Sequence, residues 1–414
     1  MRLLGVHRIH YRKGGAESVH LDHLRLFRQQ GWTCAEFAMA HPDNESSDYA
    51  GYFPPTFDPA VGSVLKRILS IPRFLHAPEA AAAFDRLLAD FKPDVIHIHG
   101  LYQQLTTSVL APAVKRGIPT IYTLHDFKPV CPAYHFFNPR YGVCEKCSGG
   151  RQYNMLLNRC SGESITKDAV MALDGWVQWH TGSLRNRVSA FVAPSRFLAE
   201  KLTTLGLDAA KMHYIPNFFE TTDDVAVPED AVAAVTARYG RFVLYFGRLS
   251  QEKGLEILLR AAAERGFRLV LAGDGPARDR LETLARELTA DIVFAGHLRG
   301  VALWSHVLAA AAVTLPSIWY ENAPKSILEA QARGRVVVVS AIGGLPEMVE
   351  DGVTGYLAKP GDVADLGRVI AGVLALSPEE AARIGASAAA SANSTFTSER
   401  YFKEMSALYA RLAG

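Results

Sequence analysis

Short apolar runs alternate with longer segments of helical periodicity along the chain. The first run, MRLLGVHRI, predicts a strand, and apolar residues at helical spacing follow it up to about Gln30. Further apolar runs predict strands at 32–40, 94–100, 119–126, 191–195, 214–217, 242–246, 268–272, 292–295, 311–315 and 336–339. Strands that alternate with helices form parallel sheets with right-handed crossovers. The pattern therefore predicts an α/β protein.

The length of the chain and one polar segment predict two domains. A chain of 414 residues exceeds a single typical core. Residues 220–232 (ETTDDVAVPEDAV) are acidic, contain proline and lack apolar periodicity, and the strand–helix alternation restarts after them. We therefore expect α/β domains at 1–222 and 223–395 with a ligand cleft between them, and a final helix within 396–414.

Composition and charge exclude several classes of protein. The hydrophobic share of 49% is typical of a globular chain, and no apolar run approaches the roughly 20 residues of a membrane span. A net charge of +2 gives little electrostatic support for nucleic-acid binding. The opening strand lacks a signal-peptide pattern, and five cysteines, an odd number, do not suggest a fully paired disulfide framework. We therefore expect a cytoplasmic protein.

Residues 319–340 combine a loop, a helix and a buried strand. Pro324 suits the first turn of that helix, so Glu321 lies in the loop before it and Glu329 about one and a half turns inside it. Free N–H groups at a helix N-terminus favour phosphates, and carboxylates bind hydroxyl groups, so a ligand with a phosphate and a sugar fits. Taken alone, two such glutamates more often lie on a solvated helix face.

Other predicted strand ends carry candidate residues, because ligands of open parallel sheets bind beyond the carboxyl ends of strands. Gly14 and Gly15 precede the first helix, where they allow a close backbone approach to a phosphate or simply form an ordinary turn. His99 and His125 end two strands, and the adjacent Asp126 strengthens the case for His125.

Arg248 and Lys253 share one loop between a strand and a helix. The planar guanidinium and the ammonium can converge on a diphosphate, although such bases are more often solvated. The chain has no Asp-x-Asp triplet. We therefore expect bases and helix ends, rather than a carboxylate-bound Mg²⁺, to neutralise a diphosphate, and we expect no catalytic metal.

Four cysteines form a metal-like pattern. Cys131, Cys144, Cys147 and Cys160 follow the spacing C-x12-C-x2-C-x12-C within an insertion at 131–160 that has little apolar content. Four thiolates that include a C-x2-C pair suit a structural zinc ion. Free thiols, or a redox disulfide between Cys144 and Cys147, are the alternatives. We favour zinc.

Residues 52–78 place Lys66, Arg67 and Arg73 among apolar residues. A basic amphipathic segment can lie on an anionic bilayer, which raises the hypothesis of peripheral contact with the inner face of the membrane. A helix that covers the core of its own domain is the more common explanation, and three bases are few for a membrane signal.

In their order and spacing, the motifs resemble those of glycosyltransferase family 4, retaining enzymes with the two-Rossmann GT-B fold. The resemblance covers nearly the whole chain. Its motifs are Gly14-Gly15, the strand end at His125, Pro194-Ser195, Ile215-Pro216-Asn217, Gly247-Arg248 to Lys253-Gly254, Gly273-Asp274-Gly275-Pro276, Glu321 to Glu329, Gly343-Gly344-Leu345-Pro346-Glu347 and Asp351-Gly352-Val353-Thr354-Gly355.

The resemblance implies transfer of a sugar, with retention, from a UDP- or GDP-sugar to a glycan or lipid-linked glycan in cell-surface polysaccharide or glycolipid synthesis. Arg248 and Lys253 would bind the diphosphate. Glu321 would bind hydroxyls of the donor sugar, Glu329 the ribose, and His125 would lie near the anomeric centre. The donor site would also include Gly14, Gly15, Asp274, Asn322, Ala323, Pro324 and Lys325. The last helix would pack back on the N-terminal domain.

Two features depart from the family pattern. The usual glycine is absent from the run Glu321-Asn322-Ala323-Pro324, so we expect the loop with Lys325 and Ser326 to shape the sugar pocket differently. The cysteine insertion is not a general family feature, and it lies in the acceptor-side domain. The alternatives are a sugar-nucleotide epimerase or hydrolase on the same fold, and a non-catalytic nucleotide-sugar-binding module.

Overall fold

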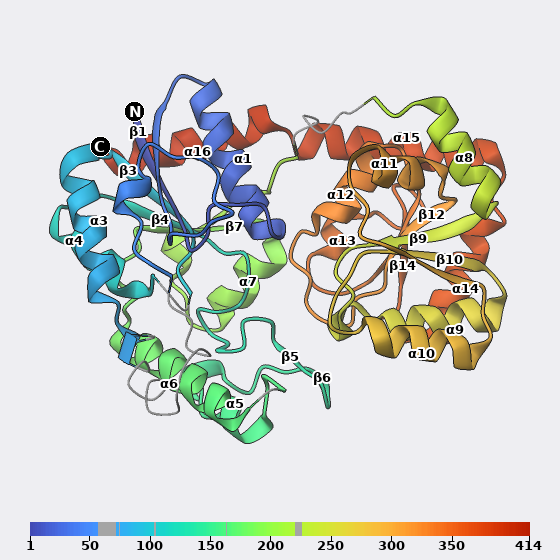
Figure 1. Ribbon diagram of the computed structural model, residues 1–414, viewed down its shortest axis with the longest axis horizontal. Helices are drawn as coiled ribbons and strands as arrows, with labels where there is room; N and C mark the ends of the chain where they lie inside the picture. The colour runs from blue at the N-terminus through green and yellow to red at the C-terminus, as the bar shows by residue number, and fades with distance from the viewer. Residues whose placement is uncertain (57–71, 74, 103–104, 163, 220–225) are drawn as a thin grey trace. The chain divides into compact units, whose positions relative to one another are not determined.

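The computed structural model describes residues 1–56, 72–73, 75–102, 105–162, 164–219 and 226–414. The chain divides into two compact α/β units (Figure 1). Unit 1 comprises Met1–Asn138, Cys144–Asn217 and Ser398–Gly414, and unit 2 comprises Pro139–Val143 and Phe218–Thr397. The boundary predicted after residue 222 lies outside the described residues.

Unit 1 contains a six-stranded parallel sheet with the order β2-β1-β3-β4-β7-β8. Its strands are β1 (Arg2–His7), β2 (Thr33–Phe37), β3 (Val95–Gly100), β4 (Thr120–Thr123), β7 (Ala190–Ala193) and β8 (Met212–Tyr214). Its described helices are α1 (Gly15–Gln29), α3 (Pro78–Phe91), α4 (Leu110–Lys115), α5 (Asn154–Asn158), α6 (Ile165–Thr181), α7 (Arg196–Thr204) and α16 (Ser398–Ala413). The cysteine-containing insertion also has two short strands, β5 (Phe137–Asn138) and β6 (Gly142–Val143).

Unit 2 contains a second six-stranded parallel sheet, with the order β11-β10-β9-β12-β13-β14. Its strands are β9 (Phe242–Phe246), β10 (Arg268–Ala272), β11 (Ile292–Gly296), β12 (Ala312–Leu315), β13 (Val337–Ser340) and β14 (Tyr356–Ala358). Helices α9 (Leu255–Arg265), α10 (Arg278–Leu288) and α14 (Val363–Leu374) lie over one face (Figure 1). Over the other face lie α8 (Glu229–Tyr239), α11 (Gly300–Ala309), α12 (Lys325–Ala332) and α15 (Pro378–Thr395), and α13 (Leu345–Met348) follows β13.

Local sequence accounts for the ends of several helices. The hydroxyl of Ser195 accepts a hydrogen bond from the Leu198 N–H over 3.2 Å, which caps α7. Gly266 ends α9 with a φ of 68°, in the left-handed region that favours glycine. Pro324 is the N-cap of α12 rather than part of its first turn, so this helix begins one residue later than the sequence predicts.

The C-terminal helix α16 belongs to unit 1, as predicted. The hydroxyl of Tyr401 is hydrogen-bonded to Nδ1 of His23 over 2.9 Å, and that of Tyr409 to Nε2 of His23 over 3.1 Å. Tyr409 also forms a short hydrogen bond to Nδ1 of His97. Both tyrosine side chains are buried. Residues from the end of the chain therefore complete the core of unit 1.

The structure bears only partly on the proposed membrane segment. Lys66 and Arg67 lie outside the described residues. Arg73 donates a hydrogen bond of 2.8 Å to the carboxylate of Glu79, at the start of α3. Among the helices that the structure describes, none is both long and apolar enough to cross a bilayer.

Candidate functional site

In unit 2 the strand order reverses at β9, which lies between β10 and β12. The chain leaves β9 through the loop at 247–254 and leaves β12 through the loop at 316–324. Sheets of this order bind ligands at that reversal, in the crevice outside the carboxyl ends of the strands. Arg248, Lys253 and Glu321, which the sequence predicts as site residues, all lie on these two loops.

Lys253 and Glu321 are in direct contact. Nζ of Lys253 donates a hydrogen bond to Oε1 of Glu321 over 2.6 Å, and the hydroxyl of Ser317 donates to the same oxygen. The Glu321 side chain is 5% exposed and that of Lys253 18%. The ammonium also lies 5.2 Å from the centroid of the Trp319 ring. The contact fixes one positive and one negative charge where a phosphate and a sugar hydroxyl can bind.

Two glycines let the loops at this edge pack backbone against backbone. Gly254 has a φ of 69°, and a Cβ there would lie 2.0 Å from the carbonyl oxygen of Pro316. Gly343 has a φ of 64°, and a Cβ there would lie 2.3 Å from the carbonyl oxygen of Glu321. That carbonyl accepts a hydrogen bond of 2.8 Å from the Gly344 N–H. The backbone of Glu321 is therefore held by a neighbouring loop that only glycine allows to approach.

The other residues predicted for the donor lie at the carboxyl ends of the same strands. The Arg248 side chain is exposed, and its carbonyl accepts a hydrogen bond of 2.7 Å from the Tyr245 hydroxyl. The carbonyl of Asp274 accepts a hydrogen bond of 2.9 Å from the Leu249 N–H, which joins the loops after β9 and β10. Asn322, Ala323 and Pro324 form the partly buried loop before α12, whose residues include Lys325 and Glu329.

The residues predicted in unit 1 lie at the ends of β1, β3 and β4. Gly14 is the N-cap of α1, and a Cβ on Gly15 would meet nothing within 4 Å, so the backbone there is open to a ligand. Nε2 of His125 is 3.0 Å from Nδ1 of His99, and the two rings stack 5.3 Å apart. Burial lowers the pKa of His125 to about 3, so its imidazole is neutral at pH 7.

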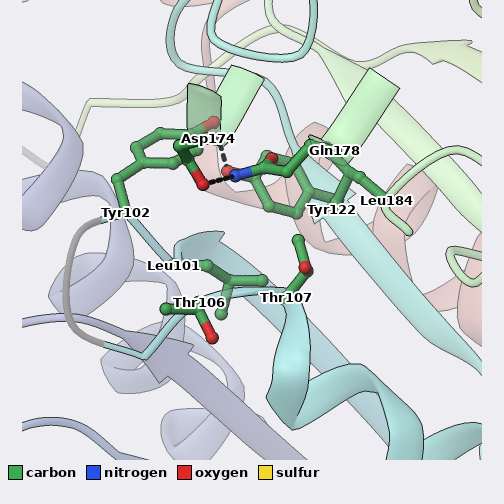
Figure 2. Close-up of a pocket in the computed structure, with 8 residues that line it drawn as sticks. All are labelled: Leu101, Tyr102, Thr106, Thr107, Tyr122, Asp174, Gln178 and Leu184. Atoms are coloured by element: carbon green, nitrogen blue, oxygen red, sulfur yellow. Dashed lines mark hydrogen bonds between the residues drawn. The ribbon is translucent and has the colours of Figure 1, made fainter. Parts of the chain in front are cut away.

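A small polar pocket follows β3 in unit 1 (Figure 2). Leu101, Tyr102, Thr106, Thr107, Tyr122, Asp174, Gln178 and Leu184 line it. The side-chain amide of Gln178 donates to the Asp174 carboxylate over 2.7 Å, and Tyr122 donates to the hydroxyl of Tyr102. The apolar pattern does not predict this pocket, because Asp174 and Gln178 lie on α6, a helix that the pattern does not predict.

Asp126, next to His125, interacts with the side chains that line this pocket. Desolvation raises its pKa to about 6, although Oδ1 accepts a hydrogen bond of 2.9 Å from the Lys128 N–H. Nζ of Lys128 is buried and donates to Asp174 over 2.9 Å. A carboxyl group with this pKa can release and take up a proton near neutral pH.

Histidines fill the core between α1 and β3. The rings of His97 and His99 stack 4.3 Å apart, and His23 lies against both. Among the described residues, His23, His97 and His99 are the group whose ligand nitrogens lie within 4.8 Å of one another, but the Tyr409 hydroxyl already hydrogen-bonds two of them. Burial lowers the pKa of His23 to about 3 and the pKa values of His20, His97 and His99 well below 6.5.

The four cysteines of the insertion are free, and Cys131, Cys147 and Cys160 are buried. Burial raises the pKa of Cys131 to about 11 and also raises that of Cys160. Throughout the described part of the chain, no three cysteine sulfurs lie within 4.8 Å of one another, whereas a tetrahedral zinc site needs sulfurs about 3.8 Å apart. The sulfurs as described do not form a closed site, and the zinc ion stays a prediction.

Two family models match the chain. The model described as "Glycosyl transferases group 1" matches residues 234–390. The model described as "Glycosyltransferase Family 4" matches residues 13–223, more than half of the chain. The chain belongs to glycosyltransferase family 4. The family that the motifs predict is therefore confirmed.

Curated relatives of this family 4 chain are named as glycosyltransferases. Alpha-D-kanosaminyltransferase of Streptomyces kanamyceticus is 32% identical over 196 residues, which cover 45% of this chain and 50% of that protein. D-inositol 3-phosphate glycosyltransferase of Mycobacterium tuberculosis is 36% identical over 183 residues, 42% of this chain and 38% of that protein. The chain thus spans about half or less of the length of these relatives.

Solved structures resemble the whole family 4 chain. Anabaena Alr3699/HepE in complex with UDP has a TM-score of 0.70 at 20% identity, over 99% of this chain and 100% of that one. Sucrose-phosphate synthase from Thermosynechococcus elongatus has a TM-score of 0.72 at 20% identity, over 99% and 98%. At this identity the likeness shows the fold, and the predicted GT-B fold is confirmed.

Proposed function

We propose that this chain is a retaining glycosyltransferase that moves a sugar from a nucleoside diphosphate sugar to an acceptor hydroxyl. The observation that carries the proposal is the contact of Lys253 with Glu321 at the strand-order reversal of unit 2. Membership of family 4 supports the reaction class. HepE has been solved with UDP and with UDP-glucose, which favours a UDP-sugar as the donor to test first.

In the proposed reaction, the acceptor oxygen bonds to the anomeric carbon while the bond from that carbon to the diphosphate breaks. Negative charge builds up on the departing phosphate oxygens, and the acceptor proton passes to that phosphate. Lys253, already held by Glu321, and the exposed Arg248 would stabilise this charge without reorganising at the moment of reaction. We assign no covalent nucleophile.

Carboxylates and a neutral histidine would position the sugar groups. One oxygen of Glu321 accepts from Lys253 and Ser317, and its second oxygen would accept from a hydroxyl of the donor sugar. Glu329 would bind the ribose. His125 is neutral and contacts His99, and in the tautomer in which Nδ1–H of His99 donates to Nε2 of His125, the Nδ1–H of His125 would donate near the anomeric centre. We propose a glycan or lipid-linked glycan as the acceptor, in the synthesis of a cell-surface polysaccharide or glycolipid.

The first test is a thermal-shift comparison of UDP, GDP and ADP. A nucleotide at about 100 times its Kd adds about 2.7 kcal/mol, which raises a melting midpoint by several degrees. We expect one nucleotide to shift the wild type and Lys359→Ala, whose lysine is 74% exposed, but not Lys253→Ala. No shift with any nucleotide would contradict donor binding. Nucleotide release from the matching sugar nucleotide, with and without acceptor, then separates a transferase from a hydrolase or a binding module.

We also propose that the cysteines of the insertion bind a structural zinc ion. The backbone N–H groups of Ala133, His135 and Phe136 are directed at the sulfur of Cys131. The amide of Asn138 donates to the sulfur of Cys160 over 3.5 Å. Hydrogen bonds of this kind support thiolate ligands. Zinc would draw the sulfurs together from their described positions.

Metal analysis of protein purified without chelator tests this proposal. We expect about one zinc ion per chain, because a closed site of four cysteines binds one ion. The ion should be lost in the Cys144→Ser, Cys147→Ser double variant and retained in Cys34→Ser, whose sulfur lies in β2. Folded wild-type protein without metal would show that the cysteines are simple buried thiols.

A further inference from the structure

His99 and His125 of unit 1 share one hydrogen bond. His99 lies in β3 and is 2% exposed, whereas His125 follows β4 and is partly exposed. Nδ1 of His99 is 3.0 Å from Nε2 of His125. Burial lowers the pKa of both imidazoles below 6.5, so at pH 7 each ring is neutral and carries one N–H. One of the two facing nitrogens is therefore the donor and the other the acceptor.

The second nitrogen of His99 decides which ring donates. Nε2 of His99 is buried, and among the described residues it has no hydrogen-bond partner. If His125 donated, the proton of His99 would lie on this Nε2, as a buried N–H without an acceptor. If His99 donates from Nδ1, its Nε2 keeps a lone pair instead. In protein interiors, orphaned N–H groups are rarer than under-satisfied acceptors. The surroundings of His99 therefore favour donation from His99 to His125.

The ring of His99 is held in place by its neighbour in β3. The rings of His97 and His99 stack with their centroids 4.3 Å apart and their planes at 18°. His97 is itself fixed at both nitrogens, by the Tyr409 hydroxyl at Nδ1 and by Oγ1 of Thr123 at Nε2 over 2.6 Å. The stack continues to His125, whose ring lies 5.3 Å from that of His99. A column of three imidazoles thus fixes the orientation of the His99 donor.

We propose that His99 is a positioning residue that sets the tautomer of His125. Donation from Nδ1 of His99 makes Nε2 of His125 an acceptor, so the proton of His125 lies on Nδ1. The consequence for the reaction rests on the proposed function: His125 presents an N–H, rather than a lone pair, to the donor sugar. In the opposite tautomer, Nδ1 of His125 would only accept hydrogen bonds. His99 is buried and acts only through His125.

Nitrogen NMR of the labelled full chain tests the tautomer without substrate. Protonated and unprotonated ring nitrogens of histidine have widely separated chemical shifts, and the signals of His125 are those lost in His125→Phe. We expect the wild type at pH 7 to show a protonated Nδ1 and an unprotonated Nε2 for His125. In His99→Leu the proton of His125 should distribute over both nitrogens, because the new side chain donates nothing to Nε2. A protonated Nε2, or a mixture of the two tautomers, in the wild type would overturn the proposal.

Initial rates of nucleotide release with acceptor show whether the tautomer matters for transfer. We expect His99→Leu to lower kcat about tenfold and to leave KM for the nucleotide sugar within about twofold, because a misdirected group near the reacting atoms costs rate more than binding. His99→Asn should recover most of the rate, since its amide can donate to Nε2 of His125. The control His76→Leu, which changes an exposed histidine of unit 1, should keep the wild-type rate.

The two measurements separate the role of His99 from the proposed function. If the wild type transfers no sugar, the proposed function fails, and the NMR result alone decides the tautomer. If His99→Leu lost rate while the proton of His125 stayed on Nδ1, His99 would act through packing only, and the positioning role would be wrong. A full rate in folded His99→Leu would overturn that role as well. Denaturant midpoints show that each variant is folded.

Discussion

Replacement of Lys253 by alanine is expected to lower the rate of sugar transfer by about two to three orders of magnitude, the usual cost of losing one group that stabilises developing charge. The same change leaves the Glu321 carboxylate, which is 5% exposed, without its cation. An unpaired buried charge costs about 3–5 kcal/mol of stability. Initial rates of nucleotide release with acceptor, and denaturant unfolding, measure the two effects.

A double variant separates catalysis from stability. Lys253→Ala combined with Glu321→Gln removes both charges, so unfolding should return toward the wild-type midpoint while transfer stays low. If transfer returned together with stability, the pair would be structural only, and the catalytic role of Lys253 would be wrong. Lys359→Ala, which changes an exposed lysine of the same unit, should keep both wild-type values.

A fall in pH from about 7.5 to about 4.5 is expected to destabilise unit 1. Burial holds the pKa of His23 and of His125 at about 3, below the ordinary 6.5. Between these values the unfolded chain binds protons that the folded chain does not, so stability is full above about pH 6.5 and falls as the pH drops. By pH 4.5, each of these two histidines lowers the free energy of unfolding by about 2.7 kcal/mol. Asp126 opposes the trend, because its raised pKa favours the folded state at low pH.

The acid effect is measured by denaturant midpoints across this pH range, and His20 offers a sharp control. Among the described residues, neither ring nitrogen of His20 has a hydrogen-bond partner, and burial lowers its pKa well below 6.5. His20→Leu should therefore raise stability, and raise it more at pH 5 than at pH 8. His297→Leu, which changes an exposed histidine, should leave the stability unchanged at both pH 5 and pH 8. If the stability of the wild type and that of His20→Leu changed equally with pH, His20 would not be a buried neutral histidine that destabilises the fold in acid.

Apolar periodicity predicted much of the fold because most buried strands and helices here follow it. The predicted strands at 242–246 and 268–272 have the bounds of β9 and β10. The apolar periodicity did not predict the helix α6, for a specific physical reason. Its carboxylates Asp168 and Asp174 face inward while Ile165 and Trp176 face solvent, so periodicity gives no usable core face.

The candidate site was predicted residue by residue but not as a set of contacts. Loops that follow strands can be found from sequence, which identified the positions of Lys253 and Glu321. Their contact requires β9 and β12 to be neighbours in the sheet. The local pattern of apolar residues does not predict the order of strands in a sheet. The histidine core needs contacts among α1, β3 and α16, the last from the far end of the chain. The roles assigned to the individual site residues stay predictions.

The return of α16 also determines when unit 1 can fold during synthesis. Tyr401 and Tyr409 leave the ribosome only after all of unit 2 has been translated, although their partners His23 and His97 are made near the start. Until then, the nascent N-terminal segment holds polar imidazoles in an unfinished core. Unit 2 is contiguous from residue 218 to 397 and can complete its main sheet first. The half of the protein that is translated first is thus the last to be completed.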